Sequence, residues 1–363
     1  MGSKHVIVIG SGILGASTAW HLVQAGARVT ILDASQPGGM ATRDSWAWLN
    51  ASWGNPEPYF RLRIRSLQEW NRLQQQVSQL QVQWSGGLLW DLPIDALEAY
   101  ASEHSAWGYG IERVDAARAL QIEPAILQPP ERALYVAQEG SVDPLAASLA
   151  LLAGAQAGGA QLQANTPVTG LHMDQHRVTG VHTAQGLLEA DEVVLAAGIG
   201  SAALLGGLGL QYRIDTPPGL LVHSKPTVPL LRTLLMTPDL HVRQTSQGRL
   251  VAGADYAGDI AGADPRELAR QLHGKVQAMV RGAEQLEMDF YTLGQRPTPG
   301  DGFPMVGRPS GLAGLYLVLS HSGITLAPAL GLFATAELLQ GVRDPLLFPY
   351  QPDRILLNNR GAL

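Results

Sequence analysis

The sequence contains no cysteine, and its only lysines are Lys4, Lys225 and Lys275. Without cysteine the chain cannot form disulfides, cysteine-ligated zinc or iron–sulfur centres, a thiolate nucleophile or a thioether bond to a cofactor. Long hydrophobic runs are absent too, because no stretch of about 18 uninterrupted apolar residues occurs. The first residues, "MGSKHVIVIG", lack the apolar region and cleavage site of a signal peptide. We therefore expect a cytoplasmic protein with no membrane span.

Positive charge is scarce as well, since the formal net charge is −6 and charged residues make up 15% of the 363 positions. This balance lacks the basic field that nucleic-acid partners require, so we expect no such partner. The hydrophobic fraction of 46% is typical of a globular chain and not of a disordered one. The length exceeds what one hydrophobic core usually organises, which favours two domains.

Strand and helix patterns alternate at the start of the chain. Residues 5–10 ("HVIVIG") and 27–33 ("ARVTILD") are typical of strands buried on both faces, and residues 12–26 between them have helical spacing. This order begins a doubly wound sheet. Further helices are expected at 57–81, 95–108, 143–160 and 264–286, the last two capped by Asp143 and Asp264, with strands of a mostly antiparallel sheet within 211–257.

The turn after the first strand carries a dinucleotide-binding fingerprint. Gly10, Gly12 and Gly15 fit G-x-G-x-x-G, and Asp33 ends the second strand. The glycines permit a tight turn, a close approach of backbone to a pyrophosphate and close packing of helix on strand. The helix N-terminus then favours the phosphates, and Asp33 would accept the ribose hydroxyls. The fingerprint alone does not distinguish NAD from FAD.

Later segments distinguish these cofactors. The strand "DEVVLAAGIGS" (191–201) ends in small residues, and the last part of the chain returns to an apolar strand followed by a helix. Together with "GGMATRDSWAWLNA" and "RPTPGDGFPMVGR…HSGITLAPALG", these segments make the whole chain resemble the D-amino acid oxidase-like family of FAD-dependent amine oxidoreductases, and in particular its glycine oxidase-like members. The C-terminal loop of this pattern disfavours an NAD-dependent dehydrogenase.

The resemblance implies an α/β protein in which a Rossmann-type FAD-binding domain is combined with a mostly antiparallel sheet-and-helix substrate domain. Residues 1–80, 138–210 and 292–363 are expected to form the FAD-binding domain, and 81–137 and 211–291 the substrate-binding domain. With no cysteine, and no histidine in the loop around 38–45, the FAD is expected to be bound non-covalently.

The resemblance also implies which residues bind FAD. Thr42 and Arg43 would lie near the pyrophosphate, Ser45, Trp46 and Trp48 along the isoalloxazine, and the backbone amides of 322–325 at the pyrimidine edge, where they favour negative charge. Trp53 contacts substrate or belongs to the core. The full expected set is Gly10, Gly12, Ile13, Leu14, Gly15, Asp33, Ala34, Ser35, Thr42, Arg43, Ser45, Trp46, Trp48, Val168, Ala197, Gly198, Ser322, Gly323, Ile324 and Thr325.

Arg296, at the head of the "RPTPGDGFPMVGR" segment, matches the family's substrate-carboxylate arginine. The alternatives are a surface arginine beside a turn or an arginine that pairs with a neighbouring acidic side chain. His321 and Asn50 are further catalytic candidates facing the cavity. Arg243 and Tyr256 are weaker candidates for lining the cavity, with an ordinary position in the sheet as the favoured alternative for each. The ten histidines are scattered, and His172, His176 and His182 on one strand pair are expected to be exposed, so no metal site is predicted.

The resemblance implies oxidative deamination of a small amino acid, of the D-amino acid or glycine type. Hydride would pass from the α-carbon to flavin N5, giving an imine that hydrolyses to a keto acid. The alternatives are oxidation of a secondary amine such as an N-alkyl amino acid, and a non-catalytic or RNA-modifying FAD-binding protein. Val251 stands where sarcosine oxidase-like members carry an oxygen-activating lysine, so oxygen and other electron acceptors both remain open. The sequence does not fix the oligomeric state.

Overall fold

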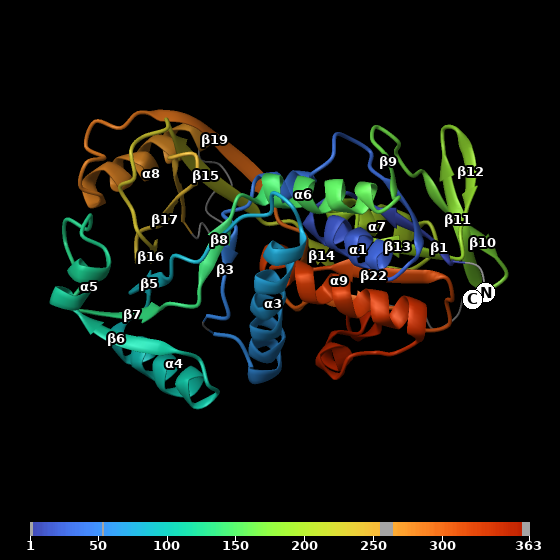
Figure 1. Ribbon diagram of the computed structural model, residues 1–363, viewed down its shortest axis with the longest axis horizontal. Helices are drawn as coiled ribbons and strands as arrows, with labels where there is room; N and C mark the ends of the chain where they lie inside the picture. The colour runs from blue at the N-terminus through green and yellow to red at the C-terminus, as the bar shows by residue number, and fades with distance from the viewer. Residues whose placement is uncertain (1–2, 53, 255–263, 358–363) are drawn as a thin grey trace.

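The first strand–helix–strand unit forms as the sequence predicts, with β1 at His5–Ile9, α1 at Ile13–Gln24 and β2 at Arg28–Leu32. The structure is a computed structural model that describes residues 3–52, 54–254 and 264–357. Gly26 follows α1 with φ of +85°, a conformation that glycine adopts without strain. Figure 1 shows an elongated molecule with a large sheet in each half.

The first large sheet has six strands in the order β21-β22-β13-β1-β2-β9. Besides β1 and β2, its strands are Gln161–Gln163 (β9), Glu192–Leu195 (β13), Met305–Gly307 (β21) and Leu315–Leu319 (β22). All neighbouring strands are parallel except β21, which runs antiparallel to β22. The inner strands β1, β13 and β22 are buried almost throughout, which explains their continuous apolar sequences.

Long apolar helices cover this sheet. Helix α6 (Pro144–Ala157) is capped as predicted, because the Asp143 carboxylate accepts a 2.8 Å hydrogen bond from the N–H of Ala146. Helix α9 (Gly323–Gln340) is long and apolar enough to cross a membrane by composition, but 72% of it is buried inside the protein. It packs on α1 and on α3 (Glu57–Gln76). We therefore interpret α9 as a core helix.

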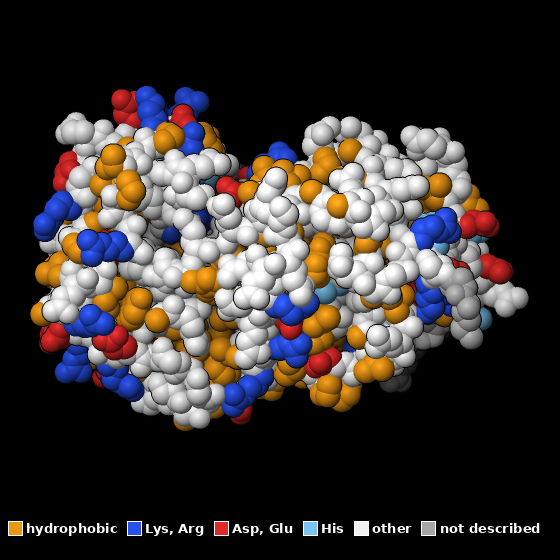
Figure 2. All heavy atoms as spheres, viewed as in Figure 1, with side chains coloured by type: hydrophobic (Ala, Val, Ile, Leu, Met, Phe, Trp, Pro, Cys, Tyr) orange, Lys and Arg blue, Asp and Glu red, His pale blue; other side chains and the backbone are white. Residues whose placement is uncertain are grey.

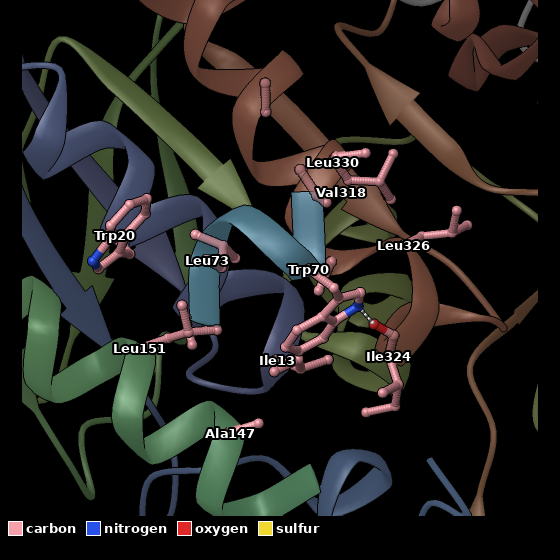
Figure 3. Close-up of a cluster of buried hydrophobic side chains, with 14 of the residues drawn as sticks. Ile13, Trp20, Trp70, Leu73, Ala147, Leu151, Val318, Ile324, Leu326 and Leu330 are labelled. Atoms are coloured by element: carbon pink, nitrogen blue, oxygen red, sulfur yellow. Dashed lines mark hydrogen bonds between the residues drawn. The ribbon is translucent and has the colours of Figure 1, made fainter. Parts of the chain in front are cut away.

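The aromatic and aliphatic side chains between these helices form the largest buried cluster. Figure 3 shows Trp70 of α3 pointing toward the first turn of α9, where its indole N–H donates a 3.1 Å hydrogen bond to the carbonyl of Ile324. Trp20 of α1 and Leu151 of α6 lie in the same cluster. Burial of one such large side chain contributes roughly 2–3 kcal/mol, so this cluster fixes the N-terminus of α9 in place.

Two helices, α3 and α8, end five or more residues earlier than the sequence predicts. Helix α3 ends at Gln76, because the next residue, Val77, is extended (φ −102°, ψ 112°) and buried. Helix α8 (Pro265–Met279) also ends early, because Val280 is extended and forms a β-bridge with Ile126. In both cases tertiary packing of a β-branched residue overrides a helical pattern.

The second large sheet has eight strands in the order β19-β15-β18-β17-β16-β5-β7-β6. These strands are Gly87–Leu89 (β5), Ile111–Asp115 (β6), Arg132–Val136 (β7), Pro218–Ser224 (β15), Leu234–Met236 (β16), His241–Gln244 (β17), Leu250–Gly253 (β18) and Met288–Gln295 (β19). All neighbours are antiparallel except β16 and β5. The mostly antiparallel sheet and the mixed α/β class are therefore confirmed.

Smaller elements complete the fold. A three-stranded sheet of β3 (Trp48–Leu49), β8 (Gly140–Val142) and β4 (Val82–Gln83) lies between the two large sheets (Figure 1). The other strands are Gly170–Asp174 (β10), Arg177–Thr183 (β11), Gly186–Glu189 (β12), Ile214–Asp215 (β14) and Thr298–Pro299 (β20). The shorter helices are Met40–Arg43 (α2), Ile94–Ala106 (α4), Ala116–Ile122 (α5), Ser201–Gly206 (α7), Gly198–Gly200 (η1), Pro345–Tyr350 (η2) and Pro352–Ile355 (η3).

The chain passes repeatedly between the two halves. Strands of the six-stranded sheet come from residues 5–32, 161–195 and 305–319, and strands of the eight-stranded sheet from 87–136 and 218–295. The domain boundaries at 1–80, 138–210 and 292–363 against 81–137 and 211–291 remain our proposal. On the face in Figure 2, basic and acidic side chains are interspersed around the rim, so neither sign of charge dominates it.

Candidate active site

A large cleft lies where the carboxyl ends of the parallel strands meet the second sheet. Its volume is about 1260 Å³, which exceeds the usual size of a pocket for one drug-sized ligand. From the first half it is lined by the β1–α1 turn, the end of β2, the loop through α2 and β3, and the first turn of α9. From the second half it is lined by parts of β15, β17 and β19. The cleft therefore has room for a dinucleotide and a small substrate together.

Gly10 and Gly15 form the tight turn and the close packing of helix on strand that the fingerprint predicts. Gly10 has φ of +99°, and a Cβ there would lie 2.4 Å from the carbonyl oxygen of Ala196. A Cβ on Gly15 would lie 2.0 Å from the carbonyl oxygen of Gly10. Gly15 is therefore a packing residue and does not line the cleft, whereas Gly10, Gly12, Ile13 and Leu14 do.

Asp33 lies at the cleft with both carboxylate oxygens held by serines. Its Oδ2 accepts hydrogen bonds from the N–H and the hydroxyl of Ser11, at 2.8 and 2.5 Å. Its Oδ1 accepts from the N–H and the hydroxyl of Ser35, at 2.9 and 3.1 Å. Ala34 and Ser35 also line the cleft. These four donors fix the carboxylate beside the space where a ribose is expected.

The loop after β2 bends toward the start of α1. The hydroxyl oxygen of Thr42 accepts a 3.0 Å hydrogen bond from the N–H of Ile13, which fixes Thr42 over the helix N-terminus. Arg43 is exposed and is not among the residues that line the cleft, so the structure does not place it beside the expected pyrophosphate. Consecutive residues of a helix point about 100° apart, so α2 turns Thr42 inward and Arg43 outward.

The tryptophans of this loop form one wall of the cleft. Ser45, Trp46 and Trp48 all line it, and the indole of Trp46 packs edge-on against His241 with ring centroids 4.6 Å apart. The Trp46 N–H donates to the carbonyl of Val251 at 3.0 Å. The Trp46 carbonyl accepts from Nε of Arg243 at 2.6 Å. Trp46 is thus held by both β17 and β18, and Arg243 is buried behind the wall and does not line the cleft.

The N-terminus of α9 forms a further wall of the cleft. Ser322 is its N-cap residue, and residues 320–325 line the cleft, including His321. The hydroxyl of Thr325 donates a 2.8 Å hydrogen bond to the carbonyl of Trp48, which joins the two walls. Ser320 Oγ is buried without a hydrogen-bond partner among the described residues. The remaining predicted cofactor residues, Val168, Ala197 and Gly198, also line the cleft.

Asn50 lines the cleft, but its amide oxygen is already engaged. The buried guanidinium of Arg63 donates to Asn50 Oδ1 at 2.6 Å, to the Asn50 carbonyl at 2.9 Å and to Ser322 Oγ at 2.9 Å. Arg63 was missed in the sequence analysis. The available signal was its position on α3, between Tyr59 and Leu67 at spacings of four, on the apolar face of an amphipathic helix.

Arg296 lines the cleft in a half-buried position. Its guanidinium lies against Gly219, where a Cβ would approach Nε to 2.7 Å. None of the carboxylates that the structure describes forms an ion pair with it. The neighbouring Asp301 instead receives two hydrogen bonds from Arg354, at 2.7 and 3.0 Å. Pairing of Arg296 with that acidic side chain is therefore excluded.

Other expectations lie away from this cleft. His172 is half-buried, not exposed as predicted, because its Nδ1 lies 3.2 Å from Nε2 of His182 across the β10–β11 pair. His176 and His182 are exposed. Within the described ranges no cluster of three or more histidine and acidic residues is arranged to hold a metal ion. Trp53 and Tyr256 lie outside the described residues.

The arrangement fits a bound FAD. The fingerprint glycines leave a backbone cradle at the N-terminus of α1, and a Cβ on Gly39 would meet the Cα of Gly12 at 2.7 Å, so two backbones meet there. The fixed carboxylate of Asp33 lies at one part of the cleft, and the amides of α9 and the unpartnered hydroxyl of Ser320 at another. A flavin dinucleotide needs both a phosphate-binding helix N-terminus and a dipole-rich ring site.

Comparisons with known proteins agree with this interpretation. The family described as FAD dependent oxidoreductase matches residues 5–338. The glycine oxidase of Pseudomonas putida is 30% identical over 380 residues, covering 97% of this chain and 99% of that protein. The glycine oxidase of Bacillus licheniformis is 28% identical over 335 residues, covering 90% of each chain.

Solved structures share the fold at lower identity. The L-proline dehydrogenase of P. horikoshii superposes with a TM-score of 0.88 at 21% identity, covering 97% of each chain. The glycine oxidase of Bacillus cereus superposes with a TM-score of 0.83 at 20% identity, covering 99% of this chain and all of that one. The predicted fold class, the FAD cofactor and the oxidoreductase class are confirmed. On the extent of the family match, the chain belongs to the FAD dependent oxidoreductase family related to D-amino acid oxidase.

Proposed function

We propose that this protein catalyses the oxidative deamination of a small amino acid, of the glycine or D-amino acid type, acting on its CH–NH₂ group. The products are an imine, which water hydrolyses to the keto acid and ammonia, and reduced cofactor. When bound, FAD supplies the hydride acceptor for this chemistry. The FAD is expected to be non-covalent, because the chain has no cysteine to form a thioether bond.

The observation that carries this proposal is the unpaired guanidinium of Arg296 in the cleft. An arginine fork matches a carboxylate with two parallel hydrogen bonds, and this one has no carboxylate partner among the described side chains. A substrate carboxylate would supply the missing charge and would fix the α-carbon in one position. Alignment of this kind is the main requirement of a hydride transfer, because reacting atoms must be held in contact.

The rest of the cleft suits a small substrate. The indoles of Trp46 and Trp48, with Met236 and Leu221, give it apolar walls, while His241 and Asn50 add a few polar groups. Apolar walls with few, fixed polar groups are typical of sites that select a small organic ligand. Asn50 and His321 remain proposed as cavity-facing residues, and their part in catalysis stays a prediction.

The electron acceptor and the location in the cell stay predictions from the sequence. The acceptor is oxygen or another oxidant, and the predicted location is the cytoplasm. Val251 takes the place where sarcosine oxidase-like members carry a lysine, and its carbonyl accepts the hydrogen bond of Trp46. We infer that oxidation of a secondary amine is the weaker alternative on this ground.

The test is anaerobic mixing of the purified holoenzyme with a panel of amino acids. The panel contains glycine, small D-amino acids, their L-enantiomers and N-methyl derivatives, and the readout is loss of the visible flavin absorption. Rapid bleaching by glycine or a small D-amino acid supports the proposal, and admission of oxygen afterwards shows whether oxygen is the acceptor. Bleaching by N-methyl amino acids alone would establish the secondary-amine alternative. No bleaching by any member would indicate a non-catalytic FAD-binding protein.

A further inference from the structure

A buried carboxylate, Glu139, lies directly behind the tryptophan wall of the cleft. It sits between β7 and β8 and is completely buried. Its Oε2 accepts a 2.8 Å hydrogen bond from the indole N–H of Trp48. Its Oε1 accepts hydrogen bonds from the hydroxyls of Ser52 and Tyr109. Glu139 takes no part in the proposed binding of the substrate carboxylate by Arg296 or in the backbone cradle at the N-terminus of α1.

The other charged and titratable groups around Glu139 come from α3, from α4 and from the loop that precedes α4. Tyr100 of α4 donates a 3.0 Å hydrogen bond to Ser52 Oγ, and Asp91 lies close enough to Tyr100 to affect its ionisation. Arg63 of α3 is near enough to favour the ionised carboxylate, but its own hydrogen bonds go to Asn50, Ser322 and Tyr59.

Burial dominates the ionisation of this group. Removal of the carboxylate from water raises the pKa of Glu139 to about 7, although the three hydrogen-bond donors and the positive charge of Arg63 act in the opposite direction. Glu139 therefore exchanges a proton near neutral pH, where its ordinary value would leave it permanently ionised.

The hydrogen bonds restrict where that proton can be held. The indole N–H of Trp48 can only donate, so Oε2 must remain an acceptor in both protonation states. The proton therefore belongs on Oε1, where the hydroxyls of Ser52 and Tyr109 can each reverse direction and accept it. The Tyr109 oxygen already accepts from the N–H of Ala51 at 3.1 Å, and Tyr109 does not line the cleft.

Ser52 does line the cleft, so it connects Oε1 of Glu139 with the substrate space. We propose that Ser52 and Glu139 form a proton relay that removes one proton from the ammonium group of the bound amino acid before its oxidation. This inference rests on the proposed function, because it requires an amino acid substrate. Glu139 acts through Ser52 and has no direct contact with the cleft.

The step is a balanced double proton transfer. One N–H bond of the ammonium breaks as its proton passes to Ser52 Oγ, and the former hydroxyl proton of Ser52 passes to Oε1 of Glu139. A cationic ammonium and an anionic carboxylate become a neutral amine and a neutral carboxylic acid. No net charge is buried or created, and the nitrogen lone pair that assists departure of the α-hydride becomes available.

The pH dependence of kcat/KM for the holoenzyme tests this relay. In the wild type we expect kcat/KM to rise with pH to a plateau through a limb near pH 7, where Glu139 ionises. In Glu139→Gln the limb near 7 should disappear and the rise should move to the higher pH at which the amine itself deprotonates in solution. At neutral pH the loss should be on the order of 100-fold, as for other positioned proton acceptors.

Variants of Ser52 separate a relay from a purely structural role. Ser52→Ala keeps the hydrogen bond between Trp48 and Glu139 but breaks the connection to the cleft, so its limb should move upward as in Glu139→Gln. Ser52→Thr retains a hydroxyl and should restore the limb near pH 7. Tyr100→Phe removes a neighbouring hydroxyl that donates to Ser52 without contacting Glu139, so it is the matched control and should keep the wild-type limb.

A second readout does not depend on turnover. An amino acid without an α-hydrogen is titrated into the holoenzyme at about pH 8 by calorimetry in buffers of different ionisation enthalpy, which reports protons released on binding. The wild type should release almost none, because the ammonium proton stays on Glu139. Glu139→Gln and Ser52→Ala should each release about one proton to solvent.

The outcomes distinguish the relay from the proposed function. If glycine and small D-amino acids bleach the wild-type flavin but no limb lies near pH 7, or if the variants lower kcat/KM equally at every pH, the relay is overturned and the proposed function stands. Equal proton release by wild type and variants overturns the relay as well. If no amino acid bleaches the flavin, the proposed function itself fails.

Discussion

The guanidinium of Arg63 holds Asn50 at two points, with hydrogen bonds of 2.6 Å to its side-chain oxygen and 2.9 Å to its carbonyl. A third bond, of 2.9 Å, reaches Ser322 at the N-terminus of α9. Arg63 forms no ion pair with any described carboxylate, and its side chain is buried. A full positive charge is thus added to the positive end of a helix dipole at the cleft.

We predict that Arg63→Met lowers the reduction potential of the bound FAD. The buried charge favours the negative charge that the flavin gains on reduction, and a charge-assisted hydrogen bond contributes about 1.5–3 kcal/mol. For a two-electron couple this corresponds to a fall on the order of 30–60 mV. Anaerobic redox titration against a dye of known potential measures it.

Two further variants serve as controls for that titration. Arg63→Lys keeps the charge and should retain most of the wild-type potential. Arg65→Met removes an arginine from the same helix whose partner is Glu69, at 2.8 Å, and should leave the potential unchanged. Equal potentials in wild type and Arg63→Met would show that this charge does not act on the flavin.

A second prediction concerns Arg296. Replacement by alanine removes the fork that we assign to the substrate carboxylate, so KM for amino acids should rise roughly 10- to 100-fold, with a smaller change in kcat. Steady-state kinetics on the preferred amino acid measures the ratio. The matched control is Arg213→Ala, because Arg213 packs against Gly300 of the same loop but pairs with Asp215 at the surface. A KM unchanged from wild type in Arg296→Ala would remove the clamp assignment.

The sequence predicted those parts of the site that depend on local pattern. The fingerprint glycines, Asp33 and the small residues after β13 follow one another along short segments, and their spacing determines a strand–turn–helix. The segment at 296–308 could also be recognised, because its prolines and glycines favour fixed turns between two sheets. The first strand–helix–strand unit was therefore predictable almost to its residue boundaries.

Features that depend on contacts between distant segments were not predictable. Arg63 meets Ser322 across 259 positions, and Glu139 meets Trp48 across 91, with no local spacing to indicate either contact. The predicted ends of α3 and α8 were wrong for the same reason, because the packing of Val77 and of Val280 determines where these helices end. Arg43 was predicted to lie near the pyrophosphate because its neighbours in the sequence belong to a motif. The direction of its side chain depends instead on its position in the helical turn of α2.

A third prediction uses two glycines of the fingerprint. A Cβ on Gly12 would meet Thr42 Oγ1 at 3.2 Å and nothing nearer, so Gly12→Ala should fold. The added methyl group occupies space at the cleft where we expect the pyrophosphate to approach the backbone. Overpacking of about 1–3 kcal/mol should then weaken FAD binding roughly 10- to 100-fold. Titration of the apoprotein with FAD, followed by flavin fluorescence, measures this.

Gly15→Ala is the contrasting variant for that titration. Its Cβ would lie 2.0 Å from a backbone carbonyl, which cannot move aside cheaply. We expect it to lower the thermal stability of the apoprotein itself, whereas Gly12→Ala should not. Loss of apoprotein stability in both variants would contradict the separate roles of the two glycines.

The last prediction concerns stability and pH, through Glu139. Burial raises its pKa from 4.5 to about 7 in the folded protein, so the folded state holds the proton more tightly than the unfolded state does. The associated stabilisation is fully present below pH 4.5 and is lost as pH rises through 7. At about 1.4 kcal/mol per pKa unit, the loss amounts to about 3 kcal/mol.

Glutamine does not titrate, so Glu139→Gln should lack this loss. Urea unfolding of both proteins at about pH 4.5 and pH 8 gives the comparison, in which every other titrating group is shared. If the difference in unfolding free energy between wild type and Glu139→Gln is the same at both pH values, the assignment of Glu139 as a buried carboxylate that exchanges a proton near pH 7 is wrong.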